Sequence, residues 1–266
     1  MRICYTPICY YEPKHGGVAH RLEQAAHNHL VVGSIPTTPT TLKLLICYAT
    51  NMNVSIPQLP KDLVVLENLQ KYLQRDETLS SAITRNEDIS SVTVKSFAAN
   101  ELQLERVNLT EAKLEKTNFL DVVFVNCDLI ATAFPDSSWQ RVGIESSRCS
   151  GLQLQNSTLK DVTFNDCKLN LANFRFSKLK NVCFKNCKLD EADFYSADLQ
   201  SVVFQDCTMN KTEFSGSKLK QTDFRTSDIT NISSISSLAG ATIDSVQLIA
   251  LAPMLANELK IQVEDK

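Results

Sequence analysis

The sequence predicts an all-β solenoid, a coil with four faces and a short helical cap at each end. From Leu104 to Ile229 every fifth residue is large and apolar except Cys149, which makes 26 positions in one register. This period matches neither a helix, with a period of about 3.6, nor a strand, with a period of about 2. A chain that turns a corner every five residues, with four faces to a coil, predicts a repeat of 20 residues.

The apolar positions support the 20-residue repeat independently when they are sorted into columns. Two opposite columns are rich in phenylalanine: Leu104, Phe124, Ile144, Phe164, Phe184, Phe204 and Phe224, and Leu114, Phe134, Leu154, Phe174, Phe194 and Phe214. The two columns between them are rich in leucine. We expect each column to stack inside the coil at a spacing of about 4.8 Å, with the coil continuous from about Leu102 to Thr230.

Several five-residue units resemble a known family. Ala172-Asn173-Phe174, Ala192-Asp193-Phe194 and Ala197-Asp198-Leu199 are similar to the A-(D/N)-(L/F)-x-x unit of the pentapeptide repeat family. The resemblance covers residues 101–231 and implies a right-handed quadrilateral parallel β-helix. The units depart from the pattern at Leu102 and Leu152, where a small residue is usual. They are also weak around 141–151, which leaves a distorted coil open there.

Residues 52–100 are predicted to form an N-terminal helical cap and the entry to the coil, because a solenoid must cover its exposed ends. The pattern over Pro60–Gln74 predicts a helix whose apolar stripe consists of Leu63, Val64, Leu66, Leu69 and Leu73. Ile89, Val94 and Ala99 already follow the five-residue register, so coiling is expected to begin before Leu104.

Residues 232–266 are predicted to form a C-terminal helical cap or a dimerisation segment. Asp244 or Ser245 can cap a helix, and Pro253 should kink or restart it. Its broad apolar stripe consists of Val246, Leu248, Ile249, Leu251, Ala252, Leu255 and Leu259. The family resemblance implies that such a helix can pair two chains as a homodimer, whereas a cap within one chain is the alternative.

Residues 1–51 differ from the rest of the chain, since they hold all four histidines and show no repeat. The stretch from His15 to Thr41 back-translates, with allowed codons, into the stems, the anticodon loop and the ACCA end of a methionine transfer RNA. We therefore predict that residues 1–51 are a spurious upstream translation, that they are disordered and dispensable, and that translation starts at Met52.

A zinc site is the structural alternative for this segment. Its ligands would be Cys4, Cys9, His15 and His20, but their spacing matches no standard zinc pattern.

Residues 52–266 hold no recognisable constellation for catalysis. They contain no histidine, no P-loop, no GxGxxG and no CxxC pair, which removes triads that use histidine and common nucleotide and metal motifs. We therefore predict no enzyme and no catalytic, cofactor-binding or metal-binding residues. The chain has no run of 18 apolar residues, so we expect no transmembrane helix.

Two sets of residues are candidate sites. One inward slot of the repeat is occupied by Cys127, Cys167, Cys187 and Cys207. These cysteines could form a metal-binding or redox ladder, but we favour the alternative that they fill the interior as small apolar side chains. Free thiols fit a reducing bacterial cytoplasm, the expected location. The other set is the carboxylates before the central residues, such as Asp193, Asp198 and Asp223, which we expect to form a solvated outer face.

The favoured function is a non-catalytic scaffold or protein-interaction module whose partner is another, unidentified protein. The alternative, which the family resemblance implies, is a DNA-mimic modulator of DNA gyrase that protects against quinolones. Mimicry needs a strongly negative surface, but residues 101–231 hold 18 acidic and 16 basic side chains. Several lysines dilute the acidity further: Lys178, Lys180, Lys185, Lys188, Lys218 and Lys220. An uncharacterised enzyme is a third hypothesis. We expect no direct binding to nucleic acid or membranes.

Overall fold

The computed structural model describes residues 54–73 and 78–264. Its contacts divide the chain into two units, residues 1–36 and 37–266, and all described residues lie in the second. The predictions made for residues 1–51, including the start at Met52 and the zinc alternative, lie outside the described residues.

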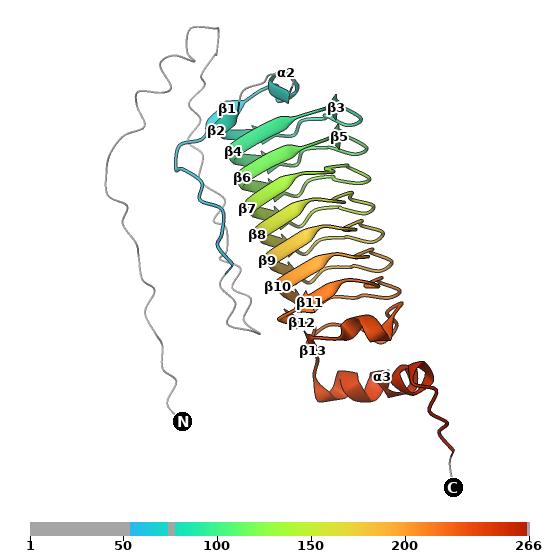
Figure 1. The fold of residues 1–266 in the computed structure, drawn as a ribbon. Helices are drawn as coiled ribbons and strands as arrows, with labels where there is room; N and C mark the ends of the chain where they lie inside the picture. Colours follow the sequence, from blue (N-terminus) through green and yellow to red (C-terminus); the bar gives the residue numbers. More distant parts are fainter. Residues whose placement is uncertain (1–53, 74–77, 265–266) are drawn as a thin grey trace, which may run out of the picture. The chain divides into compact units, whose positions relative to one another are not determined.

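The described chain forms a parallel β-solenoid of about nine turns (Figure 1). Its long sheet runs in the order β1-β2-β4-β6-β7-β8-β9-β10-β12-β13, with β11 also beside β10, and β3 pairs separately with β5. The strands are β1 (Val64–Leu66), β2 (Leu79–Arg85), β3 (Thr93–Val94), β4 (Phe97–Glu105), β5 (Lys113–Leu114), β6 (Thr117–Val125), β7 (Ser138–Glu145), β8 (Thr158–Asn165), β9 (Lys178–Lys185), β10 (Asp198–Gln205), β11 (Lys218–Lys220), β12 (Thr222–Asp223) and β13 (Ala241–Thr242). The helical elements are α2 (Gln70–Leu73), η1 (Ile235–Leu238) and α3 (Ser245–Glu258).

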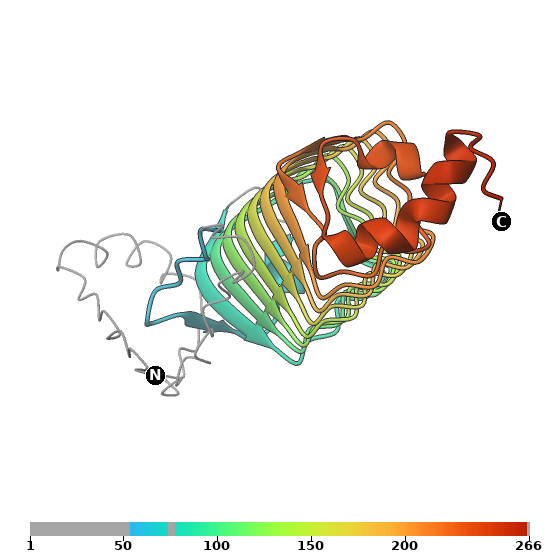
Figure 2. The same cartoon turned by 90° about the horizontal axis from the view of Figure 1, so that it is seen from below.

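The predicted right-handed quadrilateral β-helix with its 20-residue repeat is confirmed, and Figure 2 shows the coil close to end-on. Residues pair with those 20 positions away, as Leu159 does with Leu179 and Phe164 with Phe184. We number the four faces by their central residues: face 1 contains Phe184, face 2 Leu189, face 3 Phe194 and face 4 Leu199. The longer strands each run along face 4 and around the corner onto face 1.

The phenylalanine columns are stacked inside the coil as predicted. On face 1 the rings of Phe164, Phe184 and Phe204 lie parallel, with 4.9 Å between successive centroids. On the opposite face Phe174 and Phe194 stack at 4.7 Å. The two columns meet edge to face across the interior, as in the contact at 6.0 Å between Phe184 and Phe194. Aromatic pairs favour both geometries, so the interior is one continuous ring-packed core.

The coil is not distorted around residues 141–151. Strand β7 keeps its register with β6 and β8, and the bridges from Asp128 to Arg148 and on to Lys168 continue face 2. Trp139 fits inside by contacting Phe119 and Phe134 at 5.5 and 5.2 Å, and Leu152 is fully buried in the small slot. The interior therefore accepts larger residues in either inward position without breaking the ladder.

The corners explain why Asp or Asn precedes the central residue. The residue two places after most central residues has a positive φ, as in Asn181 at +53°. Asp193 accepts a hydrogen bond from the Tyr195 N–H at 2.8 Å before such a corner, and in the last coil Asp228 accepts one from the Thr230 N–H at 3.0 Å. These are Asx turns, which fix the backbone locally. The hydrogen bonds from Thr230 also lower the pKa of Asp228.

The predicted helix over Pro60–Gln74 is wrong for most of its length. Val64–Leu66 forms β1, which pairs with β2 and extends the sheet, and of the described residues 60–73 only Gln70–Leu73 is helical. The exposed edge of β2 offers unpaired backbone groups, and β-branched valines favour a strand there. Leu69 and Leu73 are buried and cover the end of the core, so the cap combines a strand with one helical turn.

At the other end α3 lies across the last coil and is a helix as predicted (Figures 1 and 2). Asp244 is its N-cap and forms a capping box with Gln247. The Gln247 amide also donates to the carbonyl oxygens of Phe224 and Ser227, both at 2.7 Å. Pro253 lies inside the helix, which continues to Glu258 rather than restarting.

Candidate interaction surface

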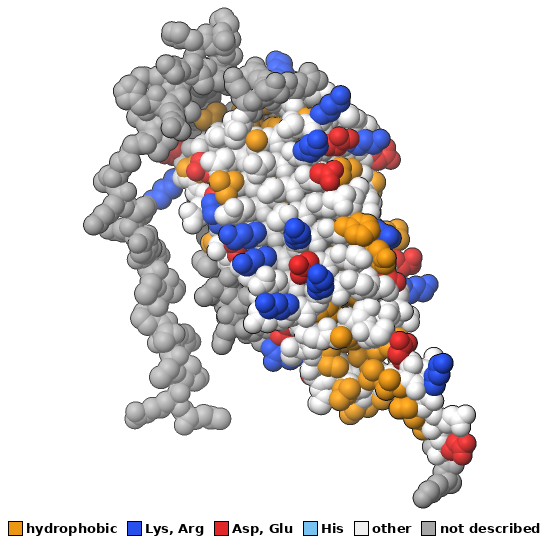
Figure 3. Space-filling model, viewed as in Figure 1, with side chains coloured by type: hydrophobic (Ala, Val, Ile, Leu, Met, Phe, Trp, Pro, Cys, Tyr) orange, Lys and Arg blue, Asp and Glu red, His pale blue; other side chains and the backbone are white. Residues whose placement is uncertain are grey.

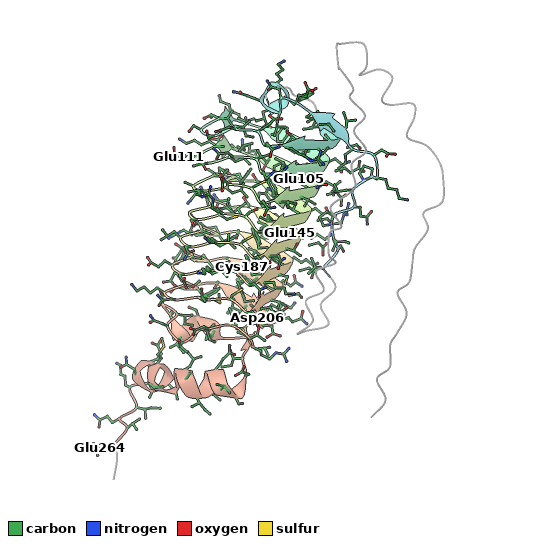
Figure 4. The ribbon with its side chains drawn as sticks, turned by 180° about the vertical axis from the view of Figure 1, so that it is seen from behind. Glu105, Glu111, Glu145, Cys187, Asp206 and Glu264 are labelled. Atoms are coloured by element: carbon green, nitrogen blue, oxygen red, sulfur yellow. The ribbon has the colours of Figure 1, made fainter. Side chains whose placement is uncertain are left out.

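The four cysteines of the inward slot lie inside the coil, as the sequence predicts. Cys127, Cys167, Cys187 and Cys207 are buried and free, and the Cys187 thiol contacts the Phe164 carbonyl oxygen at 3.4 Å. In the same slot the Ser227 hydroxyl donates to the Phe204 carbonyl oxygen at 2.9 Å. Figure 4 shows Cys187 within the stack of coils, whereas Glu111 projects from its edge. A thiol and a hydroxyl therefore occupy this position in the same way, each contacting a backbone carbonyl oxygen, which supports the interpretation that the cysteines fill the interior.

The acid–base properties of two of these thiols, Cys127 and Cys187, agree with that interpretation. Burial raises the pKa of Cys127 to about 11 and raises that of Cys187 as well. A thiol is a nucleophile or a metal ligand only as the thiolate, which burial disfavours. Within residues 54–73 and 78–264, no three His, Cys, Asp or Glu side chains gather as a metal site would require.

The carboxylates singled out from sequence do not form one solvated row. Asp198 is exposed, as expected. Asp193 and Asp223 are instead paired with Arg175 at 3.0 Å and with Arg225 at 2.7 Å. Together with their Asx turns, these pairs give Asp193 and Asp223 a local structural role.

The outer surface of face 3 carries a cluster that the sequence reasoning missed. We call it the aromatic–arginine cluster, and it consists of Arg175, Phe176 and Tyr195, with Leu171 across the same face. The Arg175 guanidinium lies 4.6 Å from the Tyr195 ring centroid and 5.6 Å from that of Phe176. The two rings contact edge to face at 5.7 Å. Because Asp193 also holds the guanidinium, the cluster is ordered before any partner arrives.

Two of these residues occupy unfavourable positions. Leu171 and Phe176 lie at corners with φ of +60° and +59°, a region that large side chains rarely adopt. Among the described residues with positive φ, they are the only large apolar ones; the other such residues are polar, Gly or Ala. Both are also exposed, Leu171 by 59% and Phe176 by 51% of its surface. Neither strain nor exposure benefits the coil, and such outliers point toward a function.

Face 4 carries a second surface feature, a lysine face made of Lys160, Lys178, Lys180, Lys218 and Lys220. These side chains are exposed on strands β8, β9 and β11. Figure 3 shows Lys and Arg side chains gathered on this part of the coil, with few acidic ones among them. From the sequence, most of these lysines are visible only as positive charges that reduce the net negative charge of the coil. Sorting the outward residues of the sequence by face would have revealed that these lysines share one face.

A third exposed feature is the apolar side of α3. Between Val246 and Pro253 every exposed residue is apolar, and Val246 and Ile249 each expose 74% of their surface. Figure 3 shows hydrophobic side chains concentrated over this end. Of the predicted stripe, Leu251 is buried against the coil and Leu255 half-buried. The helix therefore caps the core with one side and leaves an apolar side to solvent. No described helix is long and apolar enough to cross a membrane.

Comparison with known proteins adds the following. A family model described as a pentapeptide repeat region matches residues 98–174, 117–194 and 177–248, which together exceed half of the chain. No curated protein matches the sequence. A trypsin-treated variant of QnrB1, a plasmid-mediated fluoroquinolone resistance protein, is 15% identical, covers 77% of this chain and 100% of its own, and has a TM-score of 0.39. HetL from Nostoc sp. strain PCC 7120 is a pentapeptide repeat protein involved in heterocyst differentiation regulation. It is 11% identical, covers 62% of this chain and 84% of its own, and has a TM-score of 0.32.

Proposed function

This chain belongs to the pentapeptide repeat family, and we propose that it is a non-catalytic scaffold that binds another protein through the aromatic–arginine cluster. The observation that carries the proposal is the pair of exposed, large apolar side chains at left-handed corners, Leu171 and Phe176. Proteins keep strained residues where the surroundings hold them in place for a function.

The composition of the cluster matches the residues that dominate protein interfaces. Tyrosine and arginine are enriched among binding hot spots, and aromatic side chains bury a large area with little loss of conformational freedom. Arg175 is held by Asp193 and by two rings, so little ordering is required on binding. The hydrogen-bonded coil beneath supplies a rigid base.

Affinity capture with matched variants tests this proposal. The wild-type protein, Phe176→Asn, Arg175→Lys and the face 2 control Lys188→Ala serve as baits in lysate of the source organism, with captured proteins quantified by mass spectrometry. Asparagine suits a positive φ, so Phe176→Asn keeps the fold. We expect a partner that wild type and Lys188→Ala retain and that both cluster variants lose. Equal capture by all four baits contradicts the proposal.

The gyrase alternative gains no support from the surface. A mimic of duplex DNA needs closely spaced negative charge, whereas face 4 is basic and the chain carries a net charge of only −3. We therefore expect no inhibition or protection of gyrase in a supercoiling assay at micromolar protein.

We propose, in addition, that the apolar side of α3 pairs two copies of the chain. Its exposed residues from Val246 to Pro253 include no polar side chain, and an apolar patch of this kind marks an interaction surface. Light scattering of the wild type, of Val246→Glu/Ile249→Glu and of the exposed control Glu258→Gln tests it. We expect dimers for the wild type and control and a monomer for the double variant. A monomeric wild type contradicts the dimer without affecting the cluster.

A further inference from the structure

We infer that the lysine face binds an acidic segment of the protein partner, beside the aromatic–arginine cluster. This inference rests on the proposed scaffold function and specifies the chemistry of its partner. It starts from how charge is distributed around the coil rather than from its total.

The four faces differ in sign. Counting the three outward residues of each five-residue unit over residues 101–231, face 4 carries six basic and four acidic residues. The corresponding counts are three basic and five acidic on face 1, four and five on face 2, and three and four on face 3. An almost neutral average therefore hides one basic face on an otherwise slightly acidic coil.

The lysines of face 4 are unpaired. The ion pairs found within the described residues all use arginine, as in Arg141 with Asp121 at 2.5 Å. Lys160 and Lys180 lie directly opposite each other in the parallel ladder, so two like charges occupy neighbouring rungs. That arrangement is destabilising, and Asp198, between Lys178 and Lys218, is the single carboxylate in their columns.

Protection of a sheet edge applies at most to Lys218 and Lys220, whose strand β11 pairs only with β10, and does not account for Lys160, Lys178 or Lys180. Natural sheets place lysine on edge strands to prevent pairing with other chains. Strand β9, which carries Lys178 and Lys180, is paired on one side with β8 and on the other with β10. The same two columns are uncharged earlier in the coil, at Asn118, Leu120, Ser138 and Gln140, so the fold itself does not require a charge there.

A protein is a better match than nucleic acid for this face. Proteins that bind single strands stack bases on aromatic side chains, but the outward positions of face 4 contain none between Asn118 and Gln221. The chain is acidic overall, with a sequence pI of about 5.9, whereas nucleic-acid-binding domains are typically strongly basic.

The lysine face also adjoins the aromatic–arginine cluster. Phe176 lies at the corner between faces 3 and 4, two residues before Lys178. An apolar anchor beside a charged rim is the usual anatomy of a specific interface. The lysines would speed encounter and select an acidic partner, and the cluster would hold it.

Fluorescence anisotropy with labelled poly-L-glutamate as the probe tests the inference directly. Lys160→Gln/Lys180→Gln/Lys220→Gln removes three charges from face 4, and Lys168→Gln/Lys188→Gln/Lys211→Gln removes three exposed lysines from face 2. We expect the face 4 variant to bind the probe at least about tenfold more weakly and the face 2 variant within about twofold of wild type. Because the contact is electrostatic, binding should weaken as salt shortens the Debye length.

Further arms separate the possible failures. The poly-glutamate probe offers no apolar group for the aromatic–arginine cluster to hold, so a failure of the cluster proposal appears in the capture experiment and not in the anisotropy measurements. No binding of the probe at low salt, or equal losses in the two triple variants, overturns the inference. Tighter binding of a charge-matched DNA duplex than of poly-glutamate, with the same loss in the face 4 variant, also overturns it in favour of nucleic acid.

Discussion

Phe184, inside the coil, and Phe176, eight residues earlier at a corner, are the same residue type in opposite environments. Phe184 is fully buried and stacked between Phe164 and Phe204. Phe176 is half exposed, has a positive φ, and contacts the Tyr195 ring edge to face and the Arg175 guanidinium. The interior column obeys the repeat and should carry stability, whereas the corner departs from it and is proposed to carry binding.

The largest expected effect is in the interior. Phe184→Ala should lower the free energy of unfolding by about 3–5 kcal/mol, because the rings above and below cannot collapse into the space that it leaves. Lys188→Ala, exposed on face 2, should stay within about 0.5 kcal/mol. Denaturant melts of both variants measure this directly. Similar losses for the two would mean that the inward and outward positions are wrongly assigned.

An intermediate effect is expected where the C-terminal cap joins the coil. Gly240 has a φ of +89°, and a Cβ there would lie 2.6 Å from the Leu219 carbonyl oxygen. Gly240→Ala should therefore cost about 2 kcal/mol, because the added methyl group clashes with this oxygen in addition to the strain of the positive φ. Thermal melts compare it with Gly151→Ala, whose φ is also positive but whose Cβ would meet nothing nearer than 3.8 Å. An equal cost at both glycines would show that the close approach to Leu219 is unimportant.

A smaller effect is expected in the cysteine slot. Cys187→Ser should change the free energy of unfolding by no more than about 1 kcal/mol, since a buried hydroxyl that finds a hydrogen-bond partner costs little. Ser147 and Ser227 already occupy this slot and bond to backbone carbonyls. Denaturant melts check the change, and a loss several times larger would show that the thiol does something a hydroxyl cannot.

The interior was predictable because every inward position repeats every 20 residues. The register, the two phenylalanine columns and the inward slot of Cys187 all follow from that repetition, and the structure confirms them. The N-terminal cap was not predictable in the same way. Leu69 and Leu73 fit a helix, but Val64 and Val65 pair with the edge of β2, a tertiary contact that local spacing does not reveal.

The proposed binding surfaces were missed for a different physical reason. Three of every five residues face outward, and apart from a buried outward column on face 1 that includes Val123, Cys183 and Val203 they have little influence on packing, so their identities do not affect the repeat. Phe176 and Leu171 stand out only once the corners are known to need a positive φ. The lysine face appears only when charge is summed by face, because the average over the coil cancels it.

The most direct test of the central claim, that residues breaking the repeat serve binding rather than folding, is a denaturant melt of Phe176→Asn. Asparagine relieves strain of about 1–2 kcal/mol at a left-handed corner. The change also loses an exposed edge contact and a cation–π contact, each about 0.5–1 kcal/mol. Because the relieved strain and the lost contacts offset each other, we expect the free energy of unfolding of Phe176→Asn to stay within about 1 kcal/mol of wild type. A loss of about 3 kcal/mol or more, as expected for a buried ring, would contradict it.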